Sequence, residues 1–294
     1  MTTDTQAAVL IDHLSLHKIN PSMHDITRHD ILTDISLAIP AGAVVGLVGR
    51  NGAGKSSLMR CLAGLTEPTS GSSTLFGCSS QHLGDAECAR LGYVAQSADL
   101  FEWMTVAEHL DTIGRAYPRW SDQRCTLLAT RLELPMLGKV SELSGGDKQK
   151  LSLVLALAHD PDLLLLDEPV ANLDPLTRRA FMAAMFGNRA DETSSGGRQG
   201  ECTVIISSHI LSDLERVVSH VAFLREGRLQ LFDTWDAMLE HLRLVPATAG
   251  IPPAARVWDR APSRGVIIDT RHAPHLADAG ASLTLDELFL ELNT

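Results

Sequence analysis

The sequence predicts an α/β fold in which helices surround a parallel sheet. Short apolar segments alternate with segments of helical spacing along most of the chain, which is the pattern of a parallel sheet covered by helices. One apolar segment, Ala43–Val48, leads through a glycine-rich turn into a predicted helix, Ser57–Ala63. A four-leucine run, Leu163–Leu166, is too short for a helix and indicates a strand that is buried on both faces.

The other elements follow in chain order. Partial alternation predicts two edge strands, Val9–Leu16 and Ile31–Ile39, and the polar segment Lys18–Asp30 between them predicts a loop. Further short strands are predicted over Ser73–Phe76, Leu91–Val94, Thr203–Ser208 and Gly265–Ile268. Helical spacing with little β-branching predicts helices over Thr105–Ile113, Asp122–Leu132, Gly146–Ala158 and Leu176–Met185. We expect residues 97–158 to form a helical subdomain inserted into the main domain.

Two segments of biased composition suggest where the domains divide. Gly187–Glu201 is glycine-rich and poor in apolar residues, which predicts a flexible loop. Pro246–Ala255 predicts a Pro/Ala linker. Beyond it, Thr284–Leu292 predicts a helix that begins with a capping box of Thr284 and Glu287. We expect a main domain over residues 9–235 and a C-terminal accessory extension over residues 236–294.

Composition narrows the class of protein. The 294 residues carry 25 Lys+Arg against 36 Asp+Glu, a formal charge of −11, which argues against nucleic acid as a partner. No apolar run approaches the ~20 residues needed to cross a bilayer. The first residues lack the basic and apolar regions of a secretory signal. Five cysteines without a CxxC pair fit a reduced interior, so we expect a soluble intracellular protein.

The strongest chemical signal is a glycine-rich segment, Gly49-Arg50-Asn51-Gly52-Ala53-Gly54-Lys55-Ser56, between a predicted strand and a predicted helix. This is the context of a phosphate-binding P-loop. The glycines let backbone N–H groups converge on phosphate oxygens, and the helix N-terminus adds its positive dipole. We expect Lys55 to reach the β- and γ-phosphates and Ser56 to bind Mg²⁺. The alternative is a glycine-rich turn that ends by chance in Lys-Ser, which the strand and helix around it disfavour.

Two acids, Asp167 and Glu168, follow the four-leucine strand and are therefore expected at the carboxyl edge of the sheet, where ligands bind. We expect Asp167 to hold Mg²⁺ and Glu168 to act as a general base on the attacking water. Taken alone, two acids in this place are more often a strand-exit turn or a helix cap. The upstream P-loop favours the catalytic interpretation.

A third segment, Leu143–Lys150, places Ser144, Gly145 and Gly146 directly before a predicted helix, which makes another anion site or an ordinary N-cap turn. With this segment, residues 9–235 resemble the ATP-binding cassette (ABC) family. Gly49–Ser57 resembles its Walker A motif, Leu163–Glu168 its Walker B motif and Leu143–Asp147 its signature motif, where Asp147 departs from the usual Gln.

The resemblance implies a P-loop NTPase core of the RecA type, with an antiparallel β subdomain, an inserted α-helical subdomain and a small C-terminal extension. It also implies roles for Gln96 as the Q-loop glutamine, Asp174 as the D-loop aspartate and His209 as the switch histidine. The implied contacts with ATP come from Gly49, Asn51, Gly52, Ala53, Gly54, Lys55, Ser56, Ser57, Gln96, Ser144, Gly145, Gly146 and Asp174. The implied Mg²⁺ ligands are Ser56, Gln96 and Asp167, and the implied catalytic residues are Glu168 and His209.

The same resemblance implies partners and a place in the cell. Two cassettes face each other around two ATP, and an identical chain is the simpler second subunit because all motifs are present. Separate transmembrane permease subunits would hold the pair at the inner face of the cell membrane, on the cytoplasmic side. Ser97–Thr105, with Phe101 and Trp103, resembles the segment that lines the groove for a membrane subunit; the alternative is that it fills the core of its own subdomain.

The tail Ser282–Leu292 and the segment Tyr117–Trp120 resemble bacterial exporter cassettes of the drug, antibiotic and polysaccharide type, so we expect export. Import is the alternative. A non-transport cassette in DNA repair or translation is less favoured. Translation-type members carry two cassettes in one chain, and excision-repair members carry CxxC pairs, which are absent here. Chromosome-type members insert a long coiled coil between the Q-loop and the signature motif, whereas Leu143 lies only 47 positions after Gln96.

One feature departs from the family. Residues 9–35 contain no Phe, Tyr or Trp to stack on adenine, and the matching place holds Lys18 beside His17. We therefore expect the triphosphate contacts to dominate the affinity for nucleotide.

Overall fold

The structure is a computed structural model of the whole chain. It describes residues 7–21, 26–171, 173–186, 202–208, 214–215, 217–246, 250–259, 265–284, 287–288 and 290–291. The predicted loop over Gly187–Glu201 and the predicted switch histidine, His209, lie outside the described residues.

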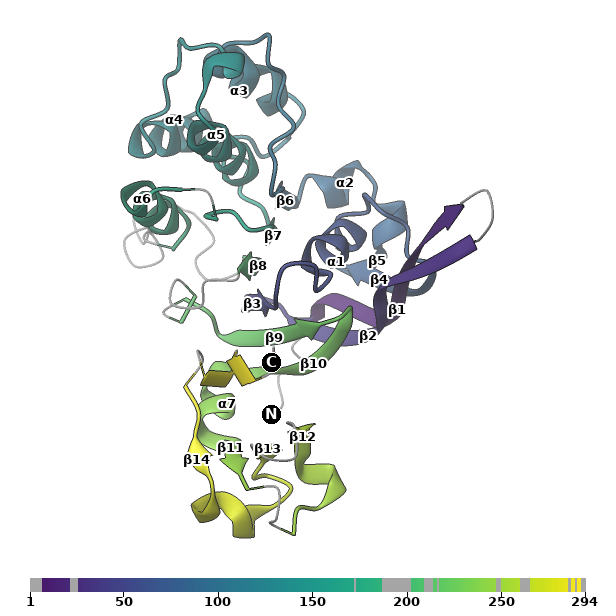
Figure 1. Cartoon of the computed structure of the whole chain (residues 1–294). Coiled ribbons are helices and arrows are strands. Elements are labelled where there is room, and N and C mark those ends of the chain that lie inside the picture. Colours follow the sequence, from purple (N-terminus) through teal and green to yellow (C-terminus); the bar gives the residue numbers. More distant parts are fainter. Residues whose placement is uncertain are drawn as a thin grey trace, which may run out of the picture.

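A six-stranded sheet with the strand order β10-β9-β3-β8-β7-β6 forms the centre of the molecule (Figure 1). Its members are β3 (Val44–Val48), β6 (Leu91–Val94), β7 (Leu163–Leu166), β8 (Thr203–Ser208), β9 (His220–Arg225) and β10 (Arg228–Thr234). All neighbours pair in parallel except β9 and β10. The predicted parallel sheet is confirmed, and β9 and β10 are additions that the sequence analysis did not predict.

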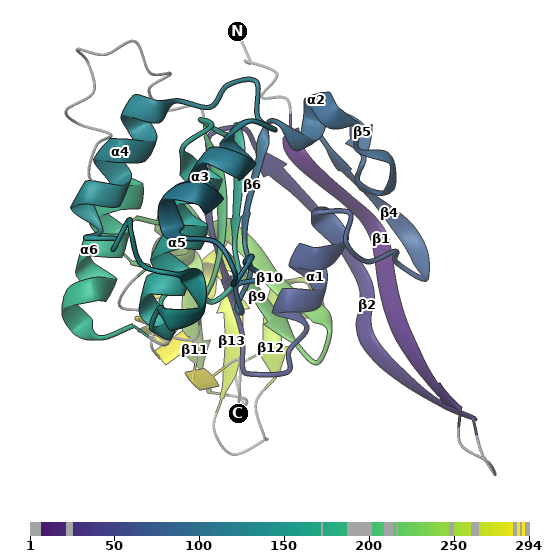
Figure 2. The ribbon, with the colours of Figure 1, turned by 90° about the horizontal axis from the view of Figure 1, so that it is seen from above.

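The four-leucine strand β7 shows why both faces of this sheet are covered. Leu164 and Leu166 join a core shared with the helices α3, α4, α5 and α6, whereas Leu163 and Leu165 join a core shared with α1 and the antiparallel sheet. Successive side chains of a strand point to opposite faces, so one continuous apolar run serves two cores. Figure 2 shows these helices on one side of the sheet and α1 (Lys55–Leu62) on the other.

A second, antiparallel sheet has the strand order β2-β1-β4-β5, and its strands are β1 (Ala7–Pro21), β2 (Ile26–Pro40), β4 (Ser70–Leu75) and β5 (Cys78–Ser79). The predicted loop over Lys18–Asp30 was wrong, because β1 and β2 remain paired out to Pro21 opposite Ile26. Pro21 is tolerated because it ends its strand, where its missing N–H costs least. The short helix α2 (Asp85–Cys88) follows this sheet.

The predicted helical insert is confirmed as α3 (Val106–Gly114), α4 (Asp122–Arg131) and α5 (Gly145–Leu157), with α6 (Pro175–Phe186) beside them. Each of these four helices begins with a side-chain cap, as α3 and α4 illustrate. Thr105 accepts the N–H of Glu108 while the Glu108 carboxylate accepts the N–H of Thr105, and Ser121 accepts the N–H of Arg124. Such caps satisfy N–H groups that the helix itself leaves without partners.

The C-terminal extension consists of α7 (Trp235–His241) and a four-stranded antiparallel sheet with the order β12-β13-β11-β14. These strands are β11 (Leu242–Val245), β12 (Arg256–Asp259), β13 (Val266–Asp269) and β14 (Ala281–Ser282). Met238, Leu242 and Ile267 belong to the same core as the central sheet. The extension therefore packs against the main domain, and the boundary at residue 236 stays a prediction.

The structure describes residues 246 and 250–255 of the predicted Pro/Ala linker, and over residues 250–255 the prediction is wrong. Ile251 and Ala255 are buried in a small core of the extension, because apolar side chains within a proline-rich segment still gain from burial.

The predicted capping box of Thr284 and Glu287 is confirmed, since the Glu287 carboxylate accepts the N–H of Thr284 at 2.8 Å and Leu288 is buried. Among the described residues, no helix has both the length and the apolar character needed to span a bilayer.

A cluster of charged residues fastens the helical insert to the start of two central strands. Asp162, just before β7, accepts hydrogen bonds from Arg90 at 2.5 Å and from Arg119 at 3.0 Å. Arg119 also donates to the carbonyl of Asp160, and Tyr117 stacks on His159 with ring centroids 4.2 Å apart. The segment that resembles exporter cassettes thus has a structural role here.

Replacing Asp162 by Ala is expected to lower the free energy of unfolding by about 2 kcal/mol, because two guanidinium groups lose their shared carboxylate. This expected loss is smaller than for a fully buried ion pair, because Arg90 and Arg119 are each at least one-third exposed. Urea unfolding at neutral pH measures the loss.

The matched control is Asp111→Ala, which removes an exposed pair with Arg115 and is expected to change stability little. Burial alone would raise the pKa of Asp162, but hydrogen bonds from Arg90 and Arg119 outweigh burial and hold it below its ordinary value. The stabilisation is therefore complete near neutral pH and is lost as acid protonates Asp162. Equal losses in the two variants would contradict this account.

Candidate functional site

The phosphate loop, Gly49–Ser56, is the turn between β3 and α1, and its glycines are required by different constraints. A Cβ on Gly49 would lie 2.2 Å from the Leu224 carbonyl oxygen, and one on Gly54 would lie 2.7 Å from Leu32. Gly54 also has φ near +101°, a conformation that L-residues avoid. Gly52 has φ near +83° and faces open space. The loop therefore curls tightly against the sheet and keeps an open outer side.

The first turn of α1 has no side chain that caps it, because its N-cap residue is Gly54. The N–H groups at the start of a helix have no partner within the helix. A helix N-terminus with these groups available attracts anions. Ser56 and Ser57 in this turn are half-buried, Asn51 is exposed and Ala53 is buried.

Lys55 lies inside the curl of the phosphate loop with 5% of its side chain exposed. Its ammonium group donates to the carbonyl oxygens of Gly49 at 2.7 Å and Arg50 at 3.2 Å. It also lies 3.3 Å from Oε1 of Glu168, whose side chain is 7% exposed. The loop and the acid at the end of β7 thus meet through one buried ion pair.

Ser207 of β8 holds the two acids that follow β7. Its hydroxyl donates to Oδ1 of Asp167 at 2.9 Å and accepts the backbone N–H of Glu168 at 2.8 Å. Glu168 has φ near +47°, which is strained for a residue with a side chain. The hydrogen bond from its N–H to Ser207 stabilises that conformation. Ser207 was not among the predicted site residues, although two serines at the end of a fully buried strand were the available signal.

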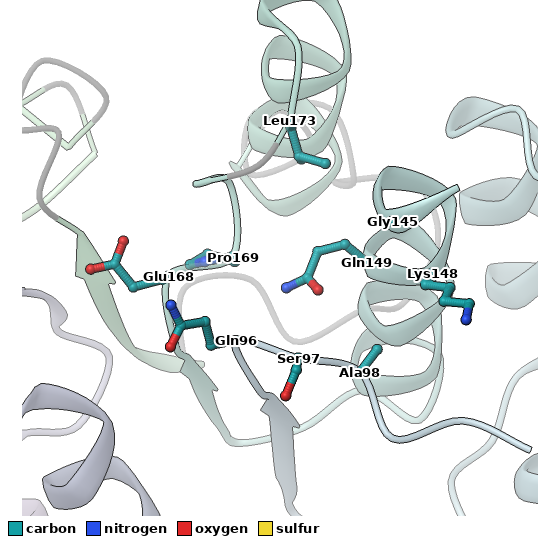
Figure 3. A pocket seen from close by; sticks show the side chains of 9 residues that line it. All are labelled: Gln96, Ser97, Ala98, Gly145, Lys148, Gln149, Glu168, Pro169 and Leu173. Carbon is teal, nitrogen blue, oxygen red and sulfur yellow. The ribbon is translucent and has the colours of Figure 1, made fainter. Parts of the chain in front are cut away.

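The edge of the sheet also brings Gln96 to the site. The backbone N–H of Asp167 donates to the carbonyl of Val94, the last residue of β6, at 2.8 Å. Gln96 follows two residues later and lines a cavity of about 300 Å³ together with Glu168 (Figure 3). Parallel strands end at one edge of their sheet, so β3, β6 and β7 bring Lys55, Gln96 and Asp167 to that edge as predicted.

The signature turn, Ser144–Gly146, starts α5 on the far side of this cavity (Figure 3). Ser144 accepts the N–H of Asp147 at 3.1 Å and donates to its carboxylate at 2.7 Å. Burial alone would raise the pKa of Asp147, but hydrogen bonds from Ser144 and Lys150 hold it below its ordinary value. Asp147, which stands where the family usually has Gln, therefore exchanges two hydrogen bonds with Ser144 and fixes the position of the Ser144 hydroxyl.

The glycines of the signature turn are not required by packing within the chain. A Cβ on Gly145 would meet nothing within 4 Å, and one on Gly146 would meet Leu173 at 3.4 Å, an ordinary contact. None of the residues from 49 to 57 lines the cavity beside this turn. Within one chain, the cavity lies between this turn and Glu168, the residue that contacts Lys55.

Asp174 caps α6, since its carboxylate accepts the N–H groups of Leu176 and Thr177 at 3.0 and 3.1 Å. Hydrogen bonds from Thr177 lower the pKa of Asp174. The part of β1 where the family usually has an adenine-stacking aromatic carries polar residues instead. His17 lies opposite Asp30 of β2, and the exposed Lys18 lies opposite His29.

Comparison with known proteins identifies the family. A family model described as "ABC transporter" matches residues 32–171. The ABC transporter ATP-binding protein YtrB of Bacillus subtilis is 31% identical over 220 residues, which cover 74% of this chain and 72% of YtrB. The chain belongs to the ABC transporter family. Its phosphate loop, Walker B acids and signature turn thus have the places in the fold that the motifs of an ATP-binding cassette predict.

Among other relatives of this cassette, some are named as export proteins and others as import proteins. The Nod factor export ATP-binding protein I of Rhizobium johnstonii is 35% identical over 205 residues, covering 67% of this chain and 62% of that protein. The methionine import ATP-binding protein MetN of Protochlamydia amoebophila is 34% identical over 218 residues, covering 70% and 62%. The cassette spans about three-fifths of the length of these relatives.

Solved structures confirm the predicted fold class. A structure titled as the ATP-binding subunit of an ABC transporter has a TM-score of 0.64 and 26% identity, covering 79% of this chain and 91% of that one. A dimeric ATP-binding cassette in a post-hydrolysis state, bound to ADP and Pi, has a TM-score of 0.65 and 21% identity, covering 77% and 98%.

The buried ion pair predicts an asymmetry between its two members. Lys55→Met leaves the Glu168 carboxylate buried without this cation and is expected to cost about 3 kcal/mol of unfolding free energy. Glu168→Gln is expected to cost less, because Lys55 keeps its bonds to the carbonyls of Gly49 and Arg50. Urea unfolding without nucleotide measures both, and the double variant is expected to be more stable than Lys55→Met. A Lys55→Met variant as stable as the unaltered chain would refute the importance of the pair.

Proposed function

We propose that this cassette binds ATP with Mg²⁺, hydrolyses it at sites shared by two cassettes, and drives separate membrane subunits. The observation that carries the proposal is the buried group of Lys55, Asp167 and Glu168 beside the uncapped N-terminus of α1. A lysine and free N–H groups at the edge of a parallel sheet suit a polyphosphate. The adjacent acids suit a metal ion and an attacking water.

The residues of the phosphate loop fit a triphosphate without rearrangement of the fold. Gly52 faces open space, and no side chain caps the first turn of α1, whereas the N–H of Ala53 already donates to the carbonyl of Arg50 at 3.1 Å. Lys55 is already placed by the carbonyls of Gly49 and Arg50. Phosphate oxygens would take over the contact that Glu168 now makes with Lys55, so nucleotide binding would release the Glu168 carboxylate.

The donor set near the loop fits Mg²⁺, which prefers oxygen ligands. The Ser56 hydroxyl, the Asp167 carboxylate and the Gln96 amide oxygen would supply them, and the hydrogen bond from Ser207 to Oδ1 fixes the orientation of Asp167. The ion when bound neutralises charge on the phosphates.

Glu168 is the proposed general base. Its strained backbone and the hydrogen bond to Ser207 direct the carboxylate toward Lys55, where the terminal phosphate would lie. His209, which lies outside the described residues, is the proposed contact to the γ-phosphate.

A second cassette would complete each site. The signature turn is separated by the cavity from Glu168 of its own chain, and Gly145 faces open space. Glycines that packing does not require fit a close approach by a ligand bound elsewhere. One similar solved structure is a cassette dimer. We infer that Ser144–Gly146 contacts the nucleotide of an identical partner and that Asp174 lies near the shared interface.

The membrane partner is inferred from the segment that follows Gln96. Leu100 packs against the core, as the alternative in the sequence analysis expected, but Phe101 is 39% and Trp103 is 72% exposed. Their rings lie 5.1 Å apart and form one aromatic surface. Exposed paired aromatics are typical of interaction sites. We propose that this surface receives a separate transmembrane permease and holds the cassette at the inner face of the membrane.

Export is the proposed direction, and import is the alternative. The proposal rests on the resemblance of Ser282–Leu292 and Tyr117–Trp120 to exporter cassettes, and the names of the relatives include both an exporter and an importer. Transport of a substrate in vesicles that contain the cassette and its permease distinguishes the two.

Glu168→Gln tests the proposed chemistry. The variant keeps Lys55 and the phosphate loop, so it is expected to bind ATP while its turnover falls by at least ~100-fold, because an amide does not accept the proton of the attacking water. Size-exclusion chromatography with ATP and Mg²⁺ is expected to show a dimer that the unaltered chain forms only transiently. Normal turnover would remove Glu168 from the proposed role.

Trp103→Ala tests the membrane partner. The loss of a large exposed aromatic at an interface is expected to weaken binding by ~10-fold or more. The measurement is the fraction of tagged cassette that sediments with membranes prepared from cells that produce the unaltered chain. Leu65→Ala is the matched control, since Leu65 is exposed on the loop after α1. Equal retention of both variants would contradict a docking role for this surface.

A further inference from the structure

Gln149 joins the helix that carries the signature turn to the segment that carries Gln96. It lies in the second turn of α5 and is 8% exposed. Its side-chain amide donates to the carbonyl oxygen of Ala95 at 3.2 Å, and Ala95 directly precedes Gln96. Figure 3 shows the Gln149 side chain reaching from α5 into the cavity toward the strand end that bears Gln96.

Two further contacts hold the other end of this segment to the helical insert. Lys148, the neighbour of Gln149, pairs with Glu102 at 2.8 Å. His109 of α3 accepts the backbone N–H of Phe101 at 3.0 Å. The segment of residues 95–102 is therefore attached to α3 and α5 at both of its ends. The Lys148 pair is partly exposed, so water and salt weaken it more than the Gln149 contact.

The core of the molecule holds the residue just before this segment. The carbonyl of Val94 accepts the N–H of Asp167, so β6 moves with the Walker B acids. The carbonyl of the next residue, Ala95, accepts from Gln149 instead. The backbone is thus bonded to the central sheet up to residue 94 and to the helical insert from residue 95 onward.

We propose that Gln149 is a positioning residue that makes the segment of residues 95–102 and the first turns of α5 move as one unit. The proposal rests on the cassette dimer of the proposed function. From Gln149 to the signature residue Ser144 is less than two turns of helix, about 8 Å of axis, and a short helix segment transmits displacement without bending. A nucleotide that moves Gln96 at one site therefore moves the signature turn offered to the other site.

The predicted consequence is coupling between the two ATP sites that depends on the Gln149 amide. In the unaltered chain the Hill coefficient for ATP hydrolysis is expected to lie between 1 and 2, the limit for two sites. In Gln149→Met, which keeps the length of the side chain but removes its donor, the coefficient is expected to fall to about 1 and kcat by ~5-fold or more. The affinity for ATP in a dilute, Mg²⁺-free binding assay is expected to stay within about twofold, because Gln149 does not touch the phosphate loop.

A structural readout separates coupling from general damage. Hydrogen exchange with and without ATP is expected to change together over residues 96–104 and 144–150 in the unaltered chain, and only over residues 96–104 in Gln149→Met. Lys148→Met is the matched control, and it is expected to keep both the Hill coefficient and the joint response. Gln149→Ala is a second variant that the fold tolerates, because the side chain borders an existing cavity.

The outcomes distinguish this inference from the proposed function. An unaltered chain that does not hydrolyse ATP would contradict the proposed function itself. Cooperative hydrolysis that persists unchanged in Gln149→Met and Gln149→Ala would overturn only the role of Gln149. Hydrolysis without cooperativity in the unaltered chain, or an equal loss of coupling in Lys148→Met, would overturn it as well.

Discussion

Lys55 and Glu168 bear opposite charges in a part of the molecule that is almost closed to water, and the site is organised around their contact. A buried charge is costly unless it is paired, so the phosphate loop, which holds Lys55, and the end of β7, which holds Glu168, are fixed with respect to each other. Ser207 of β8 joins this group, because its hydroxyl binds the Asp167 carboxylate and the backbone N–H of Glu168. Three strand ends of one sheet thus share a single polar cluster.

The same pair sets what nucleotide binding would change. Lys55 has two backbone carbonyl partners besides Glu168, so phosphate oxygens would need to replace only the contact with Glu168. The strain at Glu168 is balanced by Ser207 and does not depend on Lys55. The proposed base is therefore held in place independently of the partner it would lose, which is the preorganisation that efficient proton transfer requires.

The sequence was informative wherever a residue's role depends on its own chemistry and its neighbours along the chain. The phosphate loop, the four-leucine strand and the helices of the insert were predicted for this reason. The long hairpin of β1 and β2 was not, because its polar outer half pairs with a strand that local composition does not reveal. Ser207 was missed in the same way, since its importance comes from the two acids on the adjacent strand β7.

Two sets of glycines in this chain serve different needs, and the contrast bears on how many chains form a site. Gly49 and Gly54 are required by backbone and side chains of their own molecule, at distances that exclude a Cβ. Gly145 has open space where a Cβ would lie, so the fold of one chain gives no reason for a glycine there. A glycine costs stability because it is flexible in the unfolded chain, and the fold of one chain does not need Gly145. A ligand that approaches this turn from outside would explain the glycine. In the proposed dimer of cassettes, that ligand would be the nucleotide bound by the partner.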